Sequence, residues 1–356
     1  MIFFLFDKKG RAMKSLNIKF VCYLLTISLT IFLIPTLAFS GDSKMWVYAT
    51  LSSPPEGVCI DSNKNLYATL ALTGEVVLIK DDGSYEHVAW IPSKEESGQG
   101  EIYGLDVDTE DNIYVAYNQH SKYMDIHQDI MQPHHPACND VRVTRSGVYK
   151  IDAKSHKVTP VATRAEGWPF CFPDDVEIDK KGNIYLTDLT YSGIWKISPD
   201  GKKVTMWCDD PLLNWGDTPL PLGVNVVVLD KEEKNIFAAT TTIPGRIVRI
   251  PIKDDGSAGK AVIHSSGHGT FDGIEIDDEG YIYASENNLN QIVVIAPNAG
   301  WEGITPRKVI ARGAPLQGNC SLVLRDGVLY AANLAYGMPL DKRNRTIVAI
   351  KGFSKK

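Results

Sequence analysis

One motif recurs six times along this 356-residue chain, and the repetition constrains the fold more than any other feature. Each copy reads as a short apolar strand, a tight polar turn and a second strand rich in Val, Ile and Tyr. The clearest copy, FDGIEIDDEGYIYASENNLNQIVVI, occupies residues 271–295, and the others begin at residues 55, 102, 173, 222 and 318. The ends of the six first strands lie 47, 71, 51, 47 and 47 residues apart. A period of this length is typical of propellers and related repeat folds.

Two further strands follow each pair, for example SGIWKI and then KVTMWC. Four short strands at a period near 47 are typical of a β-propeller blade, so the chain is predicted to be all-β and six-bladed. The last copy ends before a fourth strand, and residues 44–50 provide a spare strand at the other end of the propeller region. We expect this N-terminal strand to join the last blade and close the ring.

The interval of 71 residues contains an insert at about residues 119–145, which holds His120, His127, His134 and His135. A long insert in a regular propeller favours a functional lid over the opening. Four histidines also suggest metal binding, but their spacing fits no tight ligand set, so a polar surface lid is the plainer interpretation.

The first forty residues read as a secretory signal, with Met13 as the better start. A short basic region precedes an apolar run at 20–37, and small residues stand before a cleavage point after Ser40. An uncleaved membrane anchor is the alternative, because the run could nearly span a bilayer. Cleavage predicts one mature propeller domain at 41–356 that is free of the membrane and is periplasmic or secreted. We also expect it to be a monomer.

The five cysteines that follow the signal show no C-x-x-C pair, which disfavours a structural zinc site. Cys59 and Cys320 occupy apolar strand positions, and Cys138 with Cys171 is the expected disulfide in an exported protein. The net charge of -6 gives no reason to expect a nucleic acid partner.

Counting five residues back from the end of each first strand selects one residue per copy. In a propeller, the first strands line the central axis, so these residues converge there. Turn capping by Asp and Asn explains one or two of them, but not a set with three carboxylates. The fourth copy has a longer turn. Asn225 is in register when residues are counted back from the end of the first strand, and one residue out of register when they are counted back from the second strand. The set is Glu56, Tyr103, Asp174, Asn225, Asp272 and Asn319.

Three carboxylates around a narrow axis repel one another unless a cation lies between them. Carboxylate and amide oxygens, without His or thiolate, suit Ca²⁺ or Mg²⁺ better than Zn²⁺. We therefore expect Ca²⁺, or another divalent cation such as Mg²⁺, Mn²⁺ or Zn²⁺, on the axis.

Over its whole mature length the chain resembles the senescence marker protein/gluconolactonase/luciferin-regenerating enzyme group, which includes regucalcin and bacterial lactonases. It resembles paraoxonase and diisopropylfluorophosphatase more distantly. The motifs PEGVCID, FPDDVEID, LGVNVVV and FDGIEID carry the resemblance. It implies that the metal is held by Glu56, Asp174, Asn225 and Asp272, and that Asp272 is the general base.

One departure from that group concerns the substrate. Sugar-lactone members tend to carry Arg two residues before the ligand of the third blade, where this chain has Phe172. Trp215 and the Pro- and Leu-rich run at 211–222 add apolar character, although these aromatics could simply pack the loops. We expect a lactone or ester more hydrophobic than a sugar lactone. The predicted pocket residues are Tyr103, His134, His135, Phe172, Trp215 and Asn319.

The sequence thus predicts an exported, metal-dependent hydrolase of a small molecule. Two other classes share the strand pattern. One is a non-catalytic propeller of the NHL type, which would bind a ligand or a protein with the same face. The other is a strictosidine-synthase-like lyase, which would need a Glu base near the axis. Glu56 lies at the metal register instead, which argues against the lyase.

Overall fold

The structure is a computed structural model that describes residues 43–96, 100–119, 145–165, 167, 169–215, 222–297, 305–336 and 338–355. Gly41–Lys356 forms one compact unit. The predicted signal peptide and most of the predicted insert, with His134, His135 and Cys138, lie outside the described residues, so these remain predictions. In the described part of the chain, no helix is long and apolar enough to cross a membrane.

Six four-stranded antiparallel sheets confirm the predicted six-bladed β-propeller. The first three blades are β2 (Pro55–Ile60), β3 (Leu66–Leu70), β4 (Glu75–Ile79) and β5 (Tyr85–Trp90); β6 (Gly100–Val107), β7 (Ile113–Gln119), β8 (Gly147–Ile151) and β9 (Val158–Ala162); and β10 (Pro173–Ile178), β11 (Ile184–Asp188), β12 (Gly193–Ile197) and β13 (Val204–Cys208).

The last three blades are β14 (Val224–Leu229), β15 (Asn235–Thr240), β16 (Arg246–Pro251) and β17 (Val262–Ser266); β18 (Phe271–Ile276), β19 (Ile282–Glu286), β20 (Gln291–Ile295) and β21 (Arg307–Arg312); and β22 (Asn319–Arg325), β23 (Val328–Asn333), β24 (Thr346–Lys351) and β1 (Lys44–Thr50). Three short 3-10 helices lie in connections: η2 (Pro211–Leu213), η3 (Asn287–Leu289) and η4 (Leu340–Lys342).

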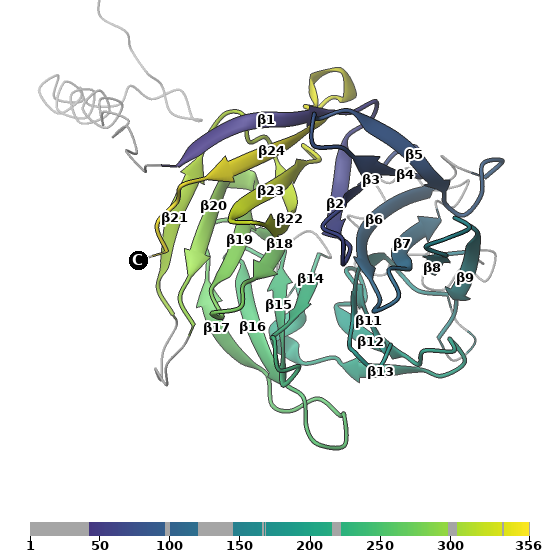
Figure 1. Cartoon of the computed structure of the whole chain (residues 1–356). Coiled ribbons are helices and arrows are strands. Elements are labelled where there is room, and N and C mark those ends of the chain that lie inside the picture. Colours follow the sequence, from purple (N-terminus) through teal and green to yellow (C-terminus); the bar gives the residue numbers. More distant parts are fainter. Residues whose placement is uncertain are drawn as a thin grey trace, which may run out of the picture. The chain divides into compact units, whose positions relative to one another are not determined.

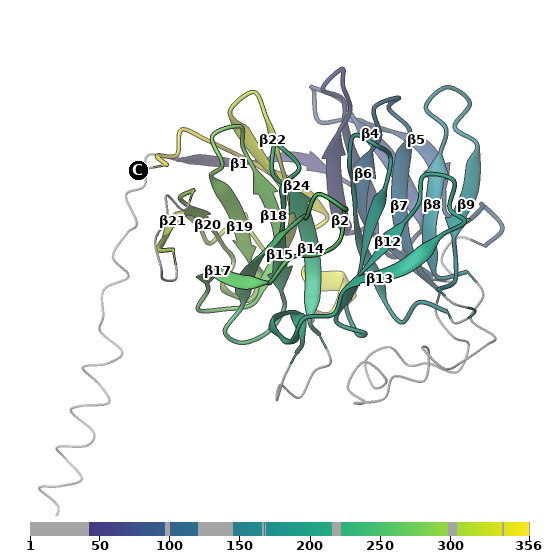
Figure 2. The ribbon, with the colours of Figure 1, turned by 90° about the horizontal axis from the view of Figure 1, so that it is seen from below.

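The blades follow one another around a common centre in chain order (Figure 1). Each inner strand contacts the inner strand of the blade before it and the blade after it, including β22 against β2. After a quarter turn, Figure 2 shows the blade strands running between two faces of the ring, with connecting loops at both faces. The inner strands therefore bring the first strand of every repeat to one axis.

The ring closes as predicted, because β1 pairs antiparallel with β24 and becomes the outermost strand of the sixth blade. The apolar core lies between neighbouring sheets. One cluster joins Val58 and Ala68 of the first blade to Tyr330 and Ala332 of the sixth, so closure also buries apolar surface between the two ends of the domain.

The acids that end the first strands have a structural role in the turns. Asp61 Oδ1 accepts hydrogen bonds from the backbone N–H groups of Asn63 and Asn65, and Asp179 makes the same pair of contacts in the third blade. These side chains hold the five-residue turn between the first and second strands. The sixth blade differs, because Arg325 pairs with Val328 and only Asp326 and Gly327 remain between the strands, both at positive φ.

The inner strands pack backbone to backbone near the axis, and Gly104 shows how closely. A β-carbon at Gly104 would lie 1.9 Å from Asp175 Oδ1 and 2.8 Å from Asp175 Cα. The second and third blades can therefore approach to this distance only where the side chain is a hydrogen atom.

We predict that Gly104→Ala lowers the free energy of unfolding by about 1–3 kcal/mol or more, because Asp175 Cα cannot move aside without shifting β10. Urea unfolding measures the loss. Gly193→Ala is the matched control, since its β-carbon would meet the end of the Met206 side chain at 3.0 Å, which can adjust. Equal stability of the two variants would contradict the close packing of β6 on β10.

Candidate metal and catalytic site on the propeller axis

Each inner strand is interrupted by a β-bulge at the same place. The register shifts between Pro55 and Val58 in β2, and three-residue steps shift it likewise in the other five blades. A bulge re-aims the side chains within it. The first bulge residues form a set that we call the axial ring: Glu56, Tyr103, Asp174, Asn225, Asp272 and Cys320.

Two register questions are thereby settled. Asn225 lies within the bulge between Val224 and Val227, so it is in register with the other ligand candidates. Asn319, by contrast, is one residue out, because it pairs with Asn333 before the bulge and Cys320 takes the ring position. The prediction failed in the sixth blade because the turn between its first two strands has only two residues. The residue taken as the end of the first strand was therefore one position too early, and counting five back from it selected Asn319 instead of Cys320.

Asn319 faces into the junction between the fifth and sixth blades instead of forming a pocket wall. Its side-chain amide donates to the Ser285 hydroxyl and, at 3.1 Å, to the carbonyl of Gln291. The residue is fully buried. Cys320 is a free thiol whose Sγ lies 3.2 Å from the carbonyl oxygen of Glu56, so it seals the junction of the sixth blade with the first.

The side-chain amide of Asn225 lies between two of the axial carboxylates. One end of its amide lies 2.9 Å from Asp174 Oδ2 and 3.2 Å from Asp272 Oδ1, and the other end lies 2.9 Å from the Thr241 hydroxyl. With nitrogen toward the carboxylates, the amide donates to both. With oxygen toward them, three acceptors face one another, which is stable only around a cation.

Glu56 completes the acidic set from the first blade. Its side chain is buried, and its Oε2 has no hydrogen-bond partner. Burial raises the pKa of Glu56 well above its usual range, and the nearby carboxylates of Asp174 and Asp272 raise it further. The pKa of Asp174 is likewise raised by burial and by Asp272. A buried carboxyl group with an unpaired oxygen needs either a proton or a cation.

Asp272 is held by the loop after β19. Asn287 donates from Nδ2 to Asp272 Oδ2 at 2.5 Å, which leaves Oδ1 toward Asn225. Burial raises the pKa of Asp272 to about 7, although the Asn287 hydrogen bond acts in the opposite direction. This is the range in which a carboxylate can act as a general base near neutral pH.

The donor set fits a hard divalent cation in its chemistry. Its members are three buried carboxylates and one amide oxygen, and no described Lys, Arg or His forms an ion pair with any of the carboxylates. Across the described ranges, however, no three His, Cys, Asp or Glu side chains form a ready-made metal cluster. The candidate donor set therefore includes the amide of Asn225, which lies between two of the carboxylates.

The predicted aromatic residues pack together beside the ring. Tyr103 and Phe172 have ring centroids 5.1 Å apart and share a buried cluster with Leu189. The Tyr103 hydroxyl donates to Glu101. Asp188 holds the loop that carries Phe172, because its carboxylate accepts the N–H groups of Cys171 and Phe172 at 2.7 and 2.8 Å.

Two other predicted residues are placed less closely. Trp215 is half-buried after η2, at the edge of the described part of the link between β13 and β14.

Cys171 is disulfide-bonded, while Cys59, Cys208 and Cys320 are free. Its partner lies outside the described residues, so the pairing with Cys138 stays a prediction.

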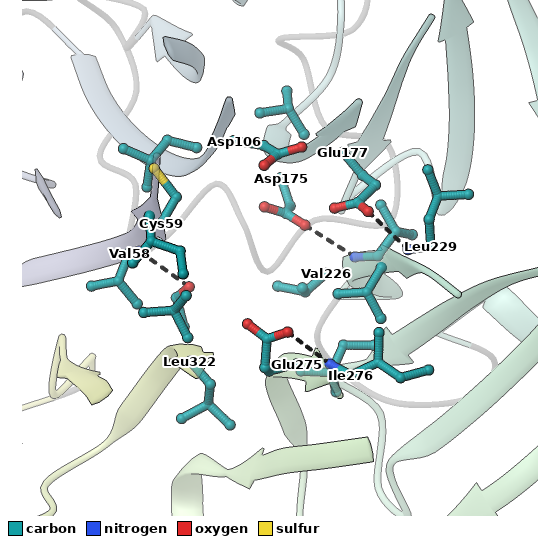
Figure 3. A pocket seen from close by; sticks show the side chains of 18 of the residues that line it. Val58, Cys59, Asp106, Asp175, Glu177, Val226, Leu229, Glu275, Ile276 and Leu322 are labelled. Atoms are coloured by element: carbon teal, nitrogen blue, oxygen red, sulfur yellow. Dashed lines mark hydrogen bonds between the residues drawn. The ribbon is translucent and has the colours of Figure 1, made fainter. Parts of the chain in front are cut away.

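A second set of acids, one buried and three half-buried, was not anticipated from the sequence. Further along the inner strands, a cavity of about 290 Å³ is lined by Asp106, Asp175, Glu177 and Glu275. All four carboxylates project toward its interior (Figure 3). Several tie neighbouring blades, since Asp175 Oδ2 accepts from Val227 N at 3.0 Å and Glu177 Oε1 accepts from Leu229 N at 2.9 Å. The repeat offered no signal for them, because alternation alone cannot tell an acid turned to the axis from one turned to solvent.

These acids predict how stability depends on pH when no divalent cation is present. Burial raises the pKa of Asp175 and of Glu275 to about 8, so both bind a proton more tightly in the folded protein than in the unfolded chain. A raised acid pKa stabilises the fold at low pH, and this contribution is lost as pH rises toward 8. In EDTA, we expect the free energy of unfolding to fall between pH 5 and pH 8, by up to about 1.4 kcal/mol per pH unit for each such group.

Urea unfolding at several pH values measures this slope. Glu275→Gln should make it shallower, because an amide does not titrate, whereas the exposed Glu279→Gln should leave it unchanged. Stability that rises from pH 5 to pH 8 in EDTA would contradict the assignment.

Comparisons with known proteins agree with this architecture. No model of a known protein family matches the chain. A lactonase drp35 of Staphylococcus haemolyticus is 25% identical over 211 residues, which cover 55% of this chain and 59% of that protein. The match thus spans little more than half the length of this relative.

Solved structures share the fold over most of the chain. A gluconolactonase from Xanthomonas campestris aligns with a TM-score of 0.62 at 13% identity, covering 87% of this chain and 90% of that one. A calcium-binding regucalcin from Agrobacterium tumefaciens aligns with a TM-score of 0.56 at 13% identity, covering 86% and 92%. The chain therefore has the six-bladed propeller fold of these proteins, and the predicted resemblance to the regucalcin-like group is confirmed.

Proposed function

We propose that this protein is a divalent-cation-dependent hydrolase that opens a lactone or cleaves an ester. The observation that carries the proposal is the axial ring, in which Glu56, Asp174 and Asp272 are buried, have no basic partner among the described residues, and have Asn225 between two of them. The sequence match to a lactonase and the shared fold with a gluconolactonase support the same reaction class.

Four residues of the ring would take part in the reaction. Glu56, Asp174, Asn225 and Asp272 would hold the cation, with Ca²⁺ favoured by the all-oxygen set. Polarisation of the substrate carbonyl and compensation of the developing oxyanion are what a bound divalent cation supplies. Asp272 would take a proton from a water molecule as its oxygen attacks the carbonyl carbon, and Asn287 would hold the carboxylate in place during the transfer.

The surroundings favour a substrate more hydrophobic than a sugar lactone. Because Leu70 pairs with Pro55, the loops between second and third strands lie at the face where the inner strands begin, which is the face of the axial ring. Six exposed apolar side chains belong to these loops: Tyr191, Ile243, Leu289, Tyr336, Met338 and Leu340. A face that exposes these side chains would give an apolar substrate a favourable approach.

We also infer that the protein is exported to the periplasm or outside the cell, on the strength of the basic and apolar pattern in residues 13–40. N-terminal sequencing of the protein recovered from a fractionated host tests this. A mature N-terminus near residue 41 supports export, and an intact N-terminus in the membrane fraction supports an anchor.

A substrate screen tests the reaction itself. Lactones and aryl esters with short and long acyl chains, together with a sugar lactone, are assayed in Ca²⁺ and in EDTA. We expect turnover that EDTA abolishes and that Ca²⁺ restores, with larger kcat/KM for the longer chains. Cation binding without turnover on any substrate would favour the non-catalytic propeller, and turnover that EDTA does not affect would exclude the proposed role of the ring.

A further inference from the structure

The residues opposite the six bulges alternate between hydroxyl and methyl side chains around the ring. Each lies in the second strand of a blade, between the two residues that pair with the ends of the bulge, as Thr69 lies between Ala68 and Leu70. All six are fully buried. In chain order they are Thr69, Ala116, Thr187, Ala239, Ser285 and Ala332.

The three hydroxyl groups join the blades in pairs. Thr69 Oγ1 donates to the carbonyl of Tyr103 at 2.7 Å, Thr187 Oγ1 donates to the carbonyl of Asn225 at 2.5 Å, and Ser285 donates to the carbonyl of Asn319. Each bond crosses from an odd-numbered blade to the inner strand of the next blade. The propeller is therefore linked as three pairs of blades, and the carboxylates of the axial ring stand on the odd-numbered member of each pair.

Other groups link the junctions between pairs. The Ser321 hydroxyl accepts from Val58 N at 3.2 Å between the sixth and first blades, and Thr241 donates to the carbonyl of Phe271 at 3.2 Å between the fourth and fifth. Neither group lies opposite a bulge. Blades can therefore be joined from other positions, and joining blades does not by itself explain the alternation of hydroxyl and methyl side chains opposite the bulges.

Thr187 joins two neighbouring blades that both carry a predicted metal ligand, whereas the equivalent bridge through Thr69 runs from Gly57 to Tyr103. The Thr187 hydroxyl accepts a hydrogen bond from Asp175 N at 2.8 Å and donates to Asn225 O, so it bridges the bulges of β10 and β14. Asp175 Oδ2 accepts from Val227 N at 3.0 Å and fixes the other end of the β14 bulge. The third blade thus holds the backbone of the β14 bulge through Thr187 and Asp175, and Asp175 directly follows Asp174 in the chain.

We propose that Thr187 is a positioning residue of the axial site, whose hydroxyl sets the separation between the Asp174 carboxylate and the Asn225 amide. The expected effect on the affinity for a divalent cation rests on the proposed function. The expected effect on the separation of the two side chains does not. Residues behind metal ligands commonly change metal affinity 10–100-fold when they are replaced.

The test uses the full mature chain and Ca²⁺ as the probe. Thr187→Val keeps the shape of the side chain and removes the hydroxyl. If the valine variant does not fold, Thr187→Ala is used instead, because alanine occupies this position in the even-numbered blades. Thr187→Ser restores the hydroxyl. Ser285→Ala is the matched control, because it removes the equivalent hydroxyl from the blade pair whose second member, the sixth blade, provides no predicted ligand.

Two measurements are made on each variant, namely the Ca²⁺ dissociation constant by calorimetry and a crystal structure. We expect Thr187→Val to raise the dissociation constant at least tenfold and to lengthen the 2.9 Å separation of Asp174 Oδ2 from the Asn225 amide. Thr187→Ser and Ser285→Ala should stay within about threefold of the wild type, although Ser285→Ala should lose thermal stability.

An unchanged separation in the valine or alanine variant overturns the proposal, and so does an equal loss of affinity in Ser285→Ala. A wild-type protein that binds no divalent cation would refute the proposed function instead. In that case the crystal structures alone decide the role of Thr187, because the separation can be measured without the cation.

Discussion

Asp272→Asn is expected to lower kcat by about 10³-fold on the best substrate of the screen while the protein stays folded. The substitution preserves the size of the side chain and an oxygen that can accept from Asn287, but it removes the group that takes the proton from water. A loss of 10³-fold corresponds to about 4 kcal/mol of transition-state stabilisation. The same variant should also bind the cation less tightly, since one of its ligands is no longer charged.

Steady-state kinetics at saturating Ca²⁺ separates the two effects, because high cation concentration compensates for weaker binding but not for a missing base. The pH profile gives a second readout. Burial raises the pKa of Asp272 to about 7 without a cation, and a bound cation would lower it, so the wild-type kcat/KM should fall with decreasing pH below 7. The variant should show no such limb.

Asp278→Asn serves as the control for Asp272→Asn. Asp278 lies in the turn after the same strand, with its side chain 84% exposed and paired only with Lys231 among the described residues. Its replacement should leave kcat unchanged. Retention of more than about a tenth of the wild-type rate by Asp272→Asn would exclude a general-base role, since such a base contributes at least about 10²-fold.

The fold was accessible from the sequence because each blade repeats the same local pattern. Alternating Val, Ile and Tyr residues and the Asp-capped turns recur at nearly constant spacing, so six weak local signals support one another. Closure by residues 44–50 was predictable for a similar reason, since the last repeat lacks a strand and the first is preceded by one. Register was less secure, as Asn319 shows, because it depends on turn length, and the sixth blade has the shorter Asp326–Gly327 turn.

The interior of the site was less accessible. Glu56, Asp174, Asn225 and Asp272 could be selected by register, because all four are first residues of a bulge. Asn287, which holds Asp272, lies in a loop where the repeat imposes no pattern. Thr187 was hidden for the opposite reason: it occupies a regular strand position, and Thr is so common in strands that its hydroxyl carries no signal until the neighbouring blade is in place.

Saturating Ca²⁺ is expected to raise the melting temperature of the wild-type protein by about 5–10 °C over its value in EDTA. Binding to the folded state alone stabilises it by about 4 kcal/mol at a concentration 1,000 times the dissociation constant, and a domain of this size converts that into several degrees. The reason lies in the axial ring, where mutual repulsion and burial of three carboxylates oppose folding until a cation compensates for them.

Glu56→Gln should reverse the order of stability between the two conditions. In EDTA the variant should be more stable than the wild type, because it no longer buries a carboxyl group whose Oε2 lacks a partner, and its amide can donate toward Asp174. In Ca²⁺ it should be less stable, because a charged ligand is lost. The exposed Glu279→Gln should follow the wild type in both conditions. Thermal unfolding of the three proteins in EDTA and in Ca²⁺ measures the crossing, and wild-type curves that superimpose in the two buffers would exclude a cation from the axis.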